Sequence, residues 1–146
     1  MPMAINESAR STRAHAGAAT FALVVVHIAL RTLGFDRTQR LTRHLMRTTR
    51  RIADADRVLR ALAATDAAAA WVPFRVACLE RSLAAQLLLI ARRQATEWRV
   101  GVRAHPLAMH AWLTDAAGAA IGEPVEPVGY QPLVAIRPDH PRGDAP

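Results

Sequence analysis

The most reactive side chain in the sequence is a single cysteine, Cys78, in a chain of 146 residues. It opens the segment Cys-Leu-Glu-Arg-Ser-Leu, which leads into an apolar stretch that ends near Arg93. In the first turn of a helix, backbone N–H groups carry partial positive charge, which favours a thiolate and can bind the oxyanion of a tetrahedral intermediate. Taken alone, a single cysteine among leucines is more typical of a small core residue than of a nucleophile. A second residue that could act as a base is therefore needed before Cys78 is interpreted as a nucleophile.

His110 is the candidate base, and Glu123 is the candidate acid that orients it. We predict a strand from His110 to Asp115, in which every second residue shares the face of His110. A hairpin turn then returns residues 119–123 beside this strand. One register pairs Glu123 with Trp112 and another pairs it directly with His110, and in both Glu123 shares the face of His110. Asp115 takes the other face, so Glu123 is the better third member of a triad with Cys78.

Metal and cofactor chemistry have little support in the sequence. Cys78, His105 and His110 could form a set of metal ligands, but they are scattered and include no local pair such as Cys-x-x-Cys. The sequence contains no glycine-rich phosphate loop and no dinucleotide fingerprint. We therefore expect neither a metal nor a cofactor.

The elements that must position these residues are helices first and strands later. Apolar residues recur at helical spacing before and after Cys78, and alternate with polar residues from Trp98 onward. We predict a loose arm over residues 1–15, followed by four helices over 16–30, 35–52, 54–70 and 78–93. Asp36 can cap the second helix, and Asp54 or Asp56 can cap the third. Three strands follow over 97–103, 110–115 and 119–123, with a last strand or edge over 130–136. A connection over 104–109 precedes the second strand. This order predicts an α+β fold with a small antiparallel sheet.

The length fits one compact domain with a single core. Within it we expect an N-terminal arm with helices over residues 1–53, which can dock a partner, a catalytic core over 54–136, and a flexible tail over 137–146. One cysteine excludes an internal disulfide framework, and a free thiol suits the cytoplasm.

The net charge of +7 comes entirely from arginine. Four arginines follow one side of the predicted second helix and form the arginine stripe: Arg40, Arg43, Arg47 and Arg50. Such a stripe is typical of a solvated face, and it can also dock an acidic partner. The uncharged run over 16–30 is short for a membrane span, so we favour a buried or partner-facing helix over a membrane or targeting segment.

Several of these segments together resemble the lasso-peptide leader peptidase family, bacterial proteins with a transglutaminase-like cysteine protease fold. The segments are Cys78-Leu79-Glu80-Arg81-Ser82-Leu83-Ala84, Leu87-Leu88, Arg92-Arg93, Val100-Gly101-Val102-Arg103, His110-Ala111-Trp112-Leu113, Tyr130 and Leu133. The resemblance covers roughly residues 54–134. A cysteine helix followed at this distance by a His-Ala-Trp strand is more specific than either part alone.

The resemblance implies a papain-like core in which Cys78 is the nucleophile, His110 the base and acid, and Glu123 the orienter. It implies cleavage of the leader from a ribosomally made precursor, with a separate leader-recognition protein and an ATP-dependent macrolactam cyclase as partners, and no nucleic acid. Two positions depart from the family, because Thr114 stands where Glu is frequent and Glu123 stands where Asp is usual. The alternative is a non-enzymatic, arginine-rich helical module that binds nucleic acid or an acidic partner.

Overall fold

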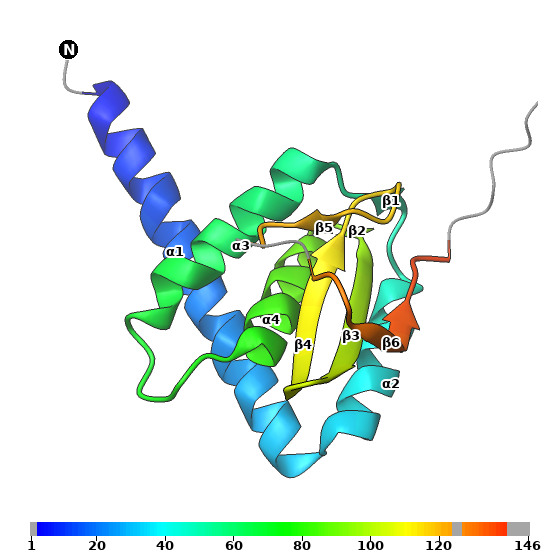
Figure 1. The fold of residues 1–146 in the computed structure, drawn as a ribbon. Helices are drawn as coiled ribbons and strands as arrows, with labels where there is room; N and C mark the ends of the chain where they lie inside the picture. Colours follow the sequence, from blue (N-terminus) through cyan, green and yellow to red (C-terminus); the bar gives the residue numbers. More distant parts are fainter. Residues whose placement is uncertain (1–2, 124–126, 140–146) are drawn as a thin grey trace, which may run out of the picture.

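The structure, a computed structural model, describes residues 3–123 and 127–139, with side chains from residue 15 onward. Its elements are α1 (Met3–Thr32), α2 (Phe35–Met46), β1 (Arg51–Ile52), α3 (Ala55–Ala69), α4 (Cys78–Ala91), β2 (Gln94–Ala95), β3 (Glu97–Ala104), β4 (Leu107–Thr114), β5 (Ala120–Ile121) and β6 (Gln131–Ile136). Four helices thus precede a small antiparallel sheet (Figure 1). The predicted α+β class is confirmed.

Helix α4 is the central element of the fold. It contacts α1, α2 and α3, and it also packs against β3 and β4 (Figure 1). Buried polar pairs fix its position on the sheet, since Trp98 Nε1 donates to Ser82 Oγ at 2.9 Å and Gln86 Nε2 donates to the Thr96 carbonyl at 2.6 Å. Because unpaired polar groups are costly inside a core, these pairs disfavour any sliding of α4 along the sheet.

The sheet has the strand order β5-β4-β3-β6, and every neighbouring pair is antiparallel. The register between β3 and β4 sets Val100 opposite Ala111 and Gly101 opposite His110. Val100 and Ala111 are buried on the face that α4 covers. Because successive strand residues alternate between faces, His110 projects from β4 on the opposite side to Ala111, where it meets Glu123, Trp112 and Tyr130.

Two predictions for the N-terminal helices were wrong. The backbone is helical from Met3 rather than forming an arm to residue 15, because residues 3–16 contain good helix formers and neither glycine nor proline. The second helix ends at Met46, and Ile52 belongs instead to β1, which pairs in parallel with β2. Asp36 lies in the first turn of α2, while Gly34 is the N-cap residue.

Two predictions for the strands also need correction. The connection predicted over 104–109 is only the turn at His105 and Pro106, joined by a cis peptide bond, and β4 begins at Leu107. The strand predicted over 119–123 is limited to Ala120–Ile121. The predictions for α3 with its Asp54 cap, for α4, for β3 and for β6 are confirmed.

Helix α1 combines a core face and an exposed apolar face. Ala22 and Leu23 are buried in the core, whereas Phe21 and Ile28 are 70% and 53% exposed. The window His15–Thr32 is long and apolar enough to cross a membrane by length and composition, and 22% of it is buried. The core helix of a soluble protein and a signal sequence can have the same length and the same apolar composition.

The carboxylate of Glu97 predicts a pH dependence of stability. Its side chain is 12% exposed and accepts hydrogen bonds from Arg99 Nε at 2.8 Å and Arg137 Nε at 3.2 Å. Burial raises the pKa of Glu97, but the two arginines outweigh burial and hold this pKa below its ordinary value. A carboxylate with a lowered pKa stabilises the fold above its unfolded value of about 4.3, and this contribution is lost as the pH falls through the folded value.

We therefore expect Glu97→Gln to lower the free energy of unfolding by about 1 kcal/mol at pH 7. The difference between the two proteins should shrink as the pH falls through the lowered pKa of Glu97, because Glu97 then becomes protonated in the folded state as well as in the unfolded state. Urea unfolding at a series of pH values measures this difference. A loss of equal size at both ends of the series would contradict the role assigned to the charge.

Candidate active site

Cys78 is the first residue of α4, and Ala77 precedes it as the N-cap residue. The helix begins here because Glu80 Oε2 accepts a hydrogen bond from the backbone N–H of Ala77 at 3.3 Å, which forms one half of a capping box. Cys78 is half-buried and packs against the hydrophobic core. The thiol is therefore at the positively polarised end of the central helix.

His110 and Glu123 are hydrogen-bonded to each other. His110 Nε2 is 2.6 Å from Glu123 Oε2, and the two side chains are 25% and 8% exposed. Because an ionised carboxylate only accepts hydrogen bonds, Nε2 carries the hydrogen and Nδ1 is the basic nitrogen. The structure thus brings two of the three predicted site residues together, in an arrangement that fixes the imidazole tautomer.

Glu123 reaches His110 by a different route from the predicted hairpin. The β4–β5 ladder pairs Leu113 with Ile121, which is midway between the two predicted registers, so both were wrong. In a continued ladder of this register Glu123 would lie on the face opposite His110. Strand β5 instead ends at Ile121, and Gly122, with a φ of 70°, turns the chain so that Glu123 meets His110.

Gly122→Ala is therefore expected to damage both stability and activity. A Cβ atom at Gly122 would lie 2.6 Å from Leu62 Cδ1 of α3, and the positive φ is itself unfavourable for alanine. We expect a loss of about 2 kcal/mol in the free energy of unfolding, together with reduced activity because Glu123 is displaced from His110. Chemical denaturation and kcat/KM measure the two effects.

Gly34→Ala is the matched control, because Gly34 also has a positive φ but a Cβ atom there would meet no atom within 4 Å. It should cost about 1 kcal/mol and leave kcat/KM unchanged. Equal effects of the two substitutions would contradict the special role of the turn at Gly122.

Arg81 links Glu123 to α4. Its Nε and Nη2 atoms donate to the two oxygens of Asp66 at 2.6 and 2.9 Å, and its Nη1 is 3.7 Å from Glu123 Oε1. The hydrogen bond to Asp66 raises the pKa of Arg81, and the charges of Glu123 and Cys78 act in the same direction. Sequence reasoning used Arg81 only as part of a motif and missed Asp66. The spacing of Arg81 three residues after Cys78, on the same side of a helix, was the available signal.

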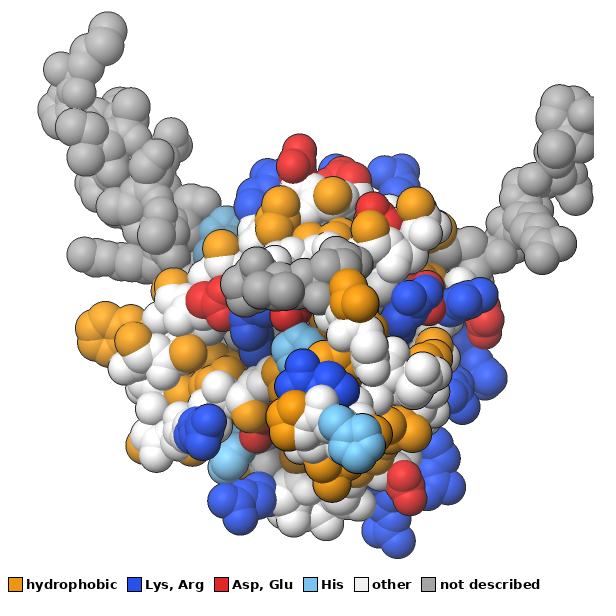
Figure 2. Space-filling model, in the orientation of Figure 1, with side chains coloured by type: hydrophobic (Ala, Val, Ile, Leu, Met, Phe, Trp, Pro, Cys, Tyr) orange, Lys and Arg blue, Asp and Glu red, His pale blue; other side chains and the backbone are white. Residues whose placement is uncertain are grey.

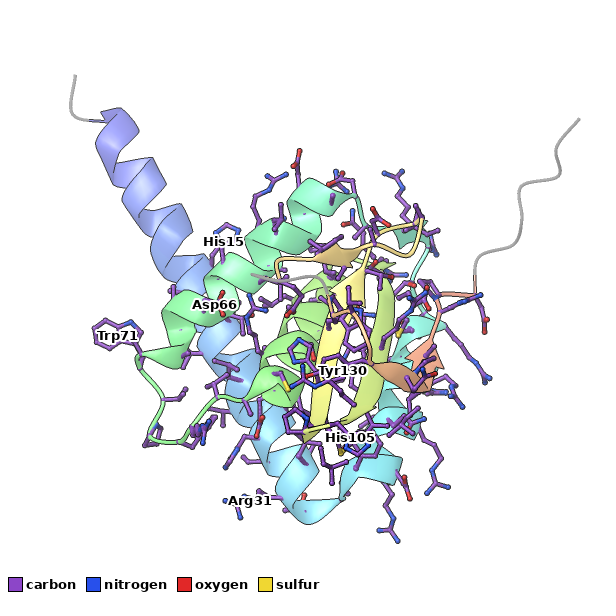
Figure 3. All side chains as sticks on the ribbon, in the orientation of Figure 1. His15, Arg31, Asp66, Trp71, His105 and Tyr130 are labelled. Atoms are coloured by element: carbon purple, nitrogen blue, oxygen red, sulfur yellow. The ribbon has the colours of Figure 1, made fainter. Side chains whose placement is uncertain are left out.

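Two aromatic rings lie beside the imidazole of His110. The ring centroids of Trp112 and Tyr130 are 5.7 and 5.8 Å from that of His110, and Figure 3 shows Tyr130 over the sheet. Gly101 makes this close packing possible, because a Cβ atom there would lie 3.0 Å from both Trp112 and Tyr130. The aromatic rings restrict the orientation of the imidazole and its access to water.

Cys78 and His110 are connected through intermediate residues. Among the residues that the structure describes, Cys78 makes no hydrogen bond to His110. Arg81 comes three residues after Cys78 on α4, and its Nη1 atom is 3.7 Å from Oε1 of Glu123, the partner of His110. Catalytic hydrogen bonds are often long in a free enzyme and shorten when substrate binds.

The other candidate residues have structural positions of their own. Asp115 closes the β4–β5 turn, because its Oδ1 accepts from the backbone N–H groups of Ala117 and Ala119, both at 2.9 Å. His105 lies in the β3–β4 turn (Figure 3). Among the side chains of residues 15–123 and 127–139, no group of three or more His, Cys, Asp or Glu residues is placed to hold a metal ion.

Comparison with known proteins gives one match. The model of the family described as Transglutaminase-like superfamily matches residues 22–135, a span that runs from α1 to β6 and contains Cys78, His110 and Glu123. No curated protein and no solved structure matches the chain.

Proposed function

The chain belongs to the transglutaminase-like superfamily, and from this premise we propose that it is a cysteine peptidase that removes the leader from a lasso-peptide precursor. The domain has a cysteine-protease-like fold, which makes peptide or amide chemistry at Cys78 the expected activity. The residues that resemble leader peptidases supply the narrower substrate class. We assign the reaction to the cytoplasm, where a free thiol stays reduced.

The observation that carries this proposal is the 2.6 Å pair of His110 and Glu123, held by Arg81 to the helix that begins at Cys78. A histidine without a chemical role gains little from a hydrogen bond to a carboxylate as buried as Glu123, which is only 8% exposed. A histidine that must present Nδ1 as a base does need one, because the acid fixes the tautomer and stabilises the imidazolium that forms.

The proposed reaction has two steps. His110 Nδ1 takes the proton of Cys78 while the sulfur attacks the carbonyl carbon of the scissile peptide bond. Backbone N–H groups in the first turn of α4 stabilise the oxyanion, and the imidazolium protonates the leaving amine to give an acyl-enzyme. His110 then removes a proton from water, which attacks the thioester and releases the carboxylate and the thiol. Glu123 stays ionised throughout.

The proposed partners are the precursor, a separate leader-recognition protein and an ATP-dependent macrolactam cyclase that acts afterwards. The exposed arginine stripe, with Arg40 and Arg43 on α2 and Arg47 and Arg50 just after it, is the proposed docking surface for the recognition protein or the precursor. Figure 2 shows basic side chains gathered over the region of α2 and β6. Charge reversal at Arg40, Arg43 and Arg47 should therefore weaken complex formation.

The test of this function is a cleavage assay with a precursor peptide encoded beside this gene. The purified protein, with and without the recognition protein, should release one leader fragment that mass spectrometry identifies. Iodoacetamide should abolish cleavage, and because the chain has one cysteine the reagent modifies one thiol. Salt-sensitive nucleic-acid binding without any cleavage would instead support the non-enzymatic alternative.

A further inference from the structure

A cavity lies far from the candidate active site. It has a volume of about 460 Å³ and is bounded by α1, α3 and the C-terminal end of α4. This volume is within the range of roughly 300–1,000 Å³ that is usual for ligand pockets. Cys78 begins α4, and a 14-residue helix rises about 20 Å from its first residue to its last. The cavity is therefore separate from the site around Cys78.

Among the side chains that the structure describes, three arginines and no carboxylate line this cavity. Arg57 and Arg60 come from α3, and Arg92 follows α4. Arg57 is partly neutralised by Asp54 at 3.4 Å, whereas the one described partner of Arg60 is the backbone carbonyl of Asp56. Arg92 Nη2 donates to His15 Nε2 at 2.8 Å, which ties α4 to α1 at the point where Figure 3 shows His15 beside α3. The cavity therefore attracts an anionic group.

Gln94 adds a polar group of a different kind. The residue lines the same cavity and is only 8% exposed. Among the described residues its Oε1 atom has no hydrogen-bond partner. A buried acceptor without a partner is unfavourable, so a ligand that supplies an N–H group here would satisfy it. A peptide backbone supplies such a donor, whereas the ionised carboxylate of a fatty acid does not.

The floor of the cavity is apolar, and small side chains predominate in it. Ala61, Ala64 and Ala91 lie beside Leu88 and Leu89. Small side chains let a bound backbone approach closely, and the leucines offer contact for an apolar side chain. Positive charge, a free amide acceptor and a shallow apolar floor together match an acidic peptide segment with apolar neighbours.

We propose that this cavity is an exosite for an acidic, partly apolar segment of the peptide substrate. An extended chain advances about 3.3 Å per residue, so a segment that spans roughly 20 Å has at least about six residues. The acidic residue is therefore expected at least about six residues from the scissile bond. The identity of the natural peptide rests on the proposed peptidase function, but binding at this cavity does not.

The experiment measures binding without cleavage. Full-length protein carrying Cys78→Ala is titrated against a fluorescein-labelled hexapeptide of alternating leucine and glutamate, and fluorescence anisotropy gives Kd. Arg60→Glu should weaken binding at least tenfold, and Gln94→Leu, which leaves the net charge unchanged, about fivefold. Arg31→Glu is the matched control, because Arg31 is exposed at the other end of α1 (Figure 3), and it should change Kd less than twofold.

Arg60→Gln provides a milder second variant, expected to weaken binding severalfold, and circular dichroism checks that each variant is folded. A hexapeptide with glutamine in place of glutamate should not bind. Equal weakening by Arg31→Glu and Arg60→Glu would overturn the exosite, because binding would then follow net charge alone. Absence of binding to the parent protein would overturn it too, and neither result bears on whether Cys78 cleaves the precursor.

Discussion

Cys78→Ala should reduce kcat/KM for precursor cleavage by at least about 10³-fold, because the acyl-enzyme cannot form without the sulfur. The residue is half-buried at the end of a helix, so its truncation removes little core packing. We expect the free energy of unfolding to change by less than about 1 kcal/mol. Steady-state kinetics and urea unfolding measure the two quantities.

Cys78→Ser is the informative companion variant. Serine keeps the size and the hydrogen-bonding capacity of the side chain but is a far weaker nucleophile at neutral pH. It should be nearly as inactive as the alanine variant while it retains binding of the precursor. Substantial activity in either variant would contradict the assignment of Cys78 as the nucleophile.

Glu123→Gln should give the second largest loss, of about 10²- to 10⁴-fold in kcat/KM. Glutamine keeps the shape of the side chain but removes the charge that fixes the tautomer of His110 and stabilises the imidazolium. The substitution also leaves Arg81 facing a neutral group at 3.7 Å, with Asp66 as its remaining anionic partner. Folding should therefore persist at reduced stability, which circular dichroism checks.

Asp115→Asn is the matched control, because it removes the same charge from the other carboxylate that the sequence offers. Asp115 Oδ1 holds the β4–β5 turn through Ala117 and Ala119 rather than contacting His110. The variant should lose about 1 kcal/mol of stability or less and keep its kcat/KM within a fewfold. A larger kinetic loss at Asp115 than at Glu123 would reverse the assignment of the third residue.

Local patterns in the sequence predicted most of the fold. The apolar periodicity of Leu79, Leu83 and Leu87 indicated a central helix, and the alternation from Trp98 to Val102 indicated a strand. The shortest strands were not predicted from such patterns. Strand β1 has only two residues, and its partner β2 is about forty residues further along the chain. No local period can reveal such a pairing.

In the candidate site, too, some features could be predicted from local sequence patterns and others depend on tertiary packing. The sequence predicted that Glu123 would lie beside His110, although the registers used for that argument were wrong. The deciding feature is the turn at Gly122, whose close contact with Leu62 depends on how α3 packs. The bidentate pair of Arg81 and Asp66 joins two helices, so it too emerges only from tertiary packing.

The measurement that tests the central claim most directly is the rate at which iodoacetamide alkylates Cys78 at pH 6. The claim is that Cys78 and His110 act as one proton-sharing unit, and the chain contains no other thiol. We predict that His110→Ala is alkylated at least about tenfold more slowly than the parent protein, because no neighbouring base then takes the proton of Cys78. Equal rates in the two folded proteins would contradict the account.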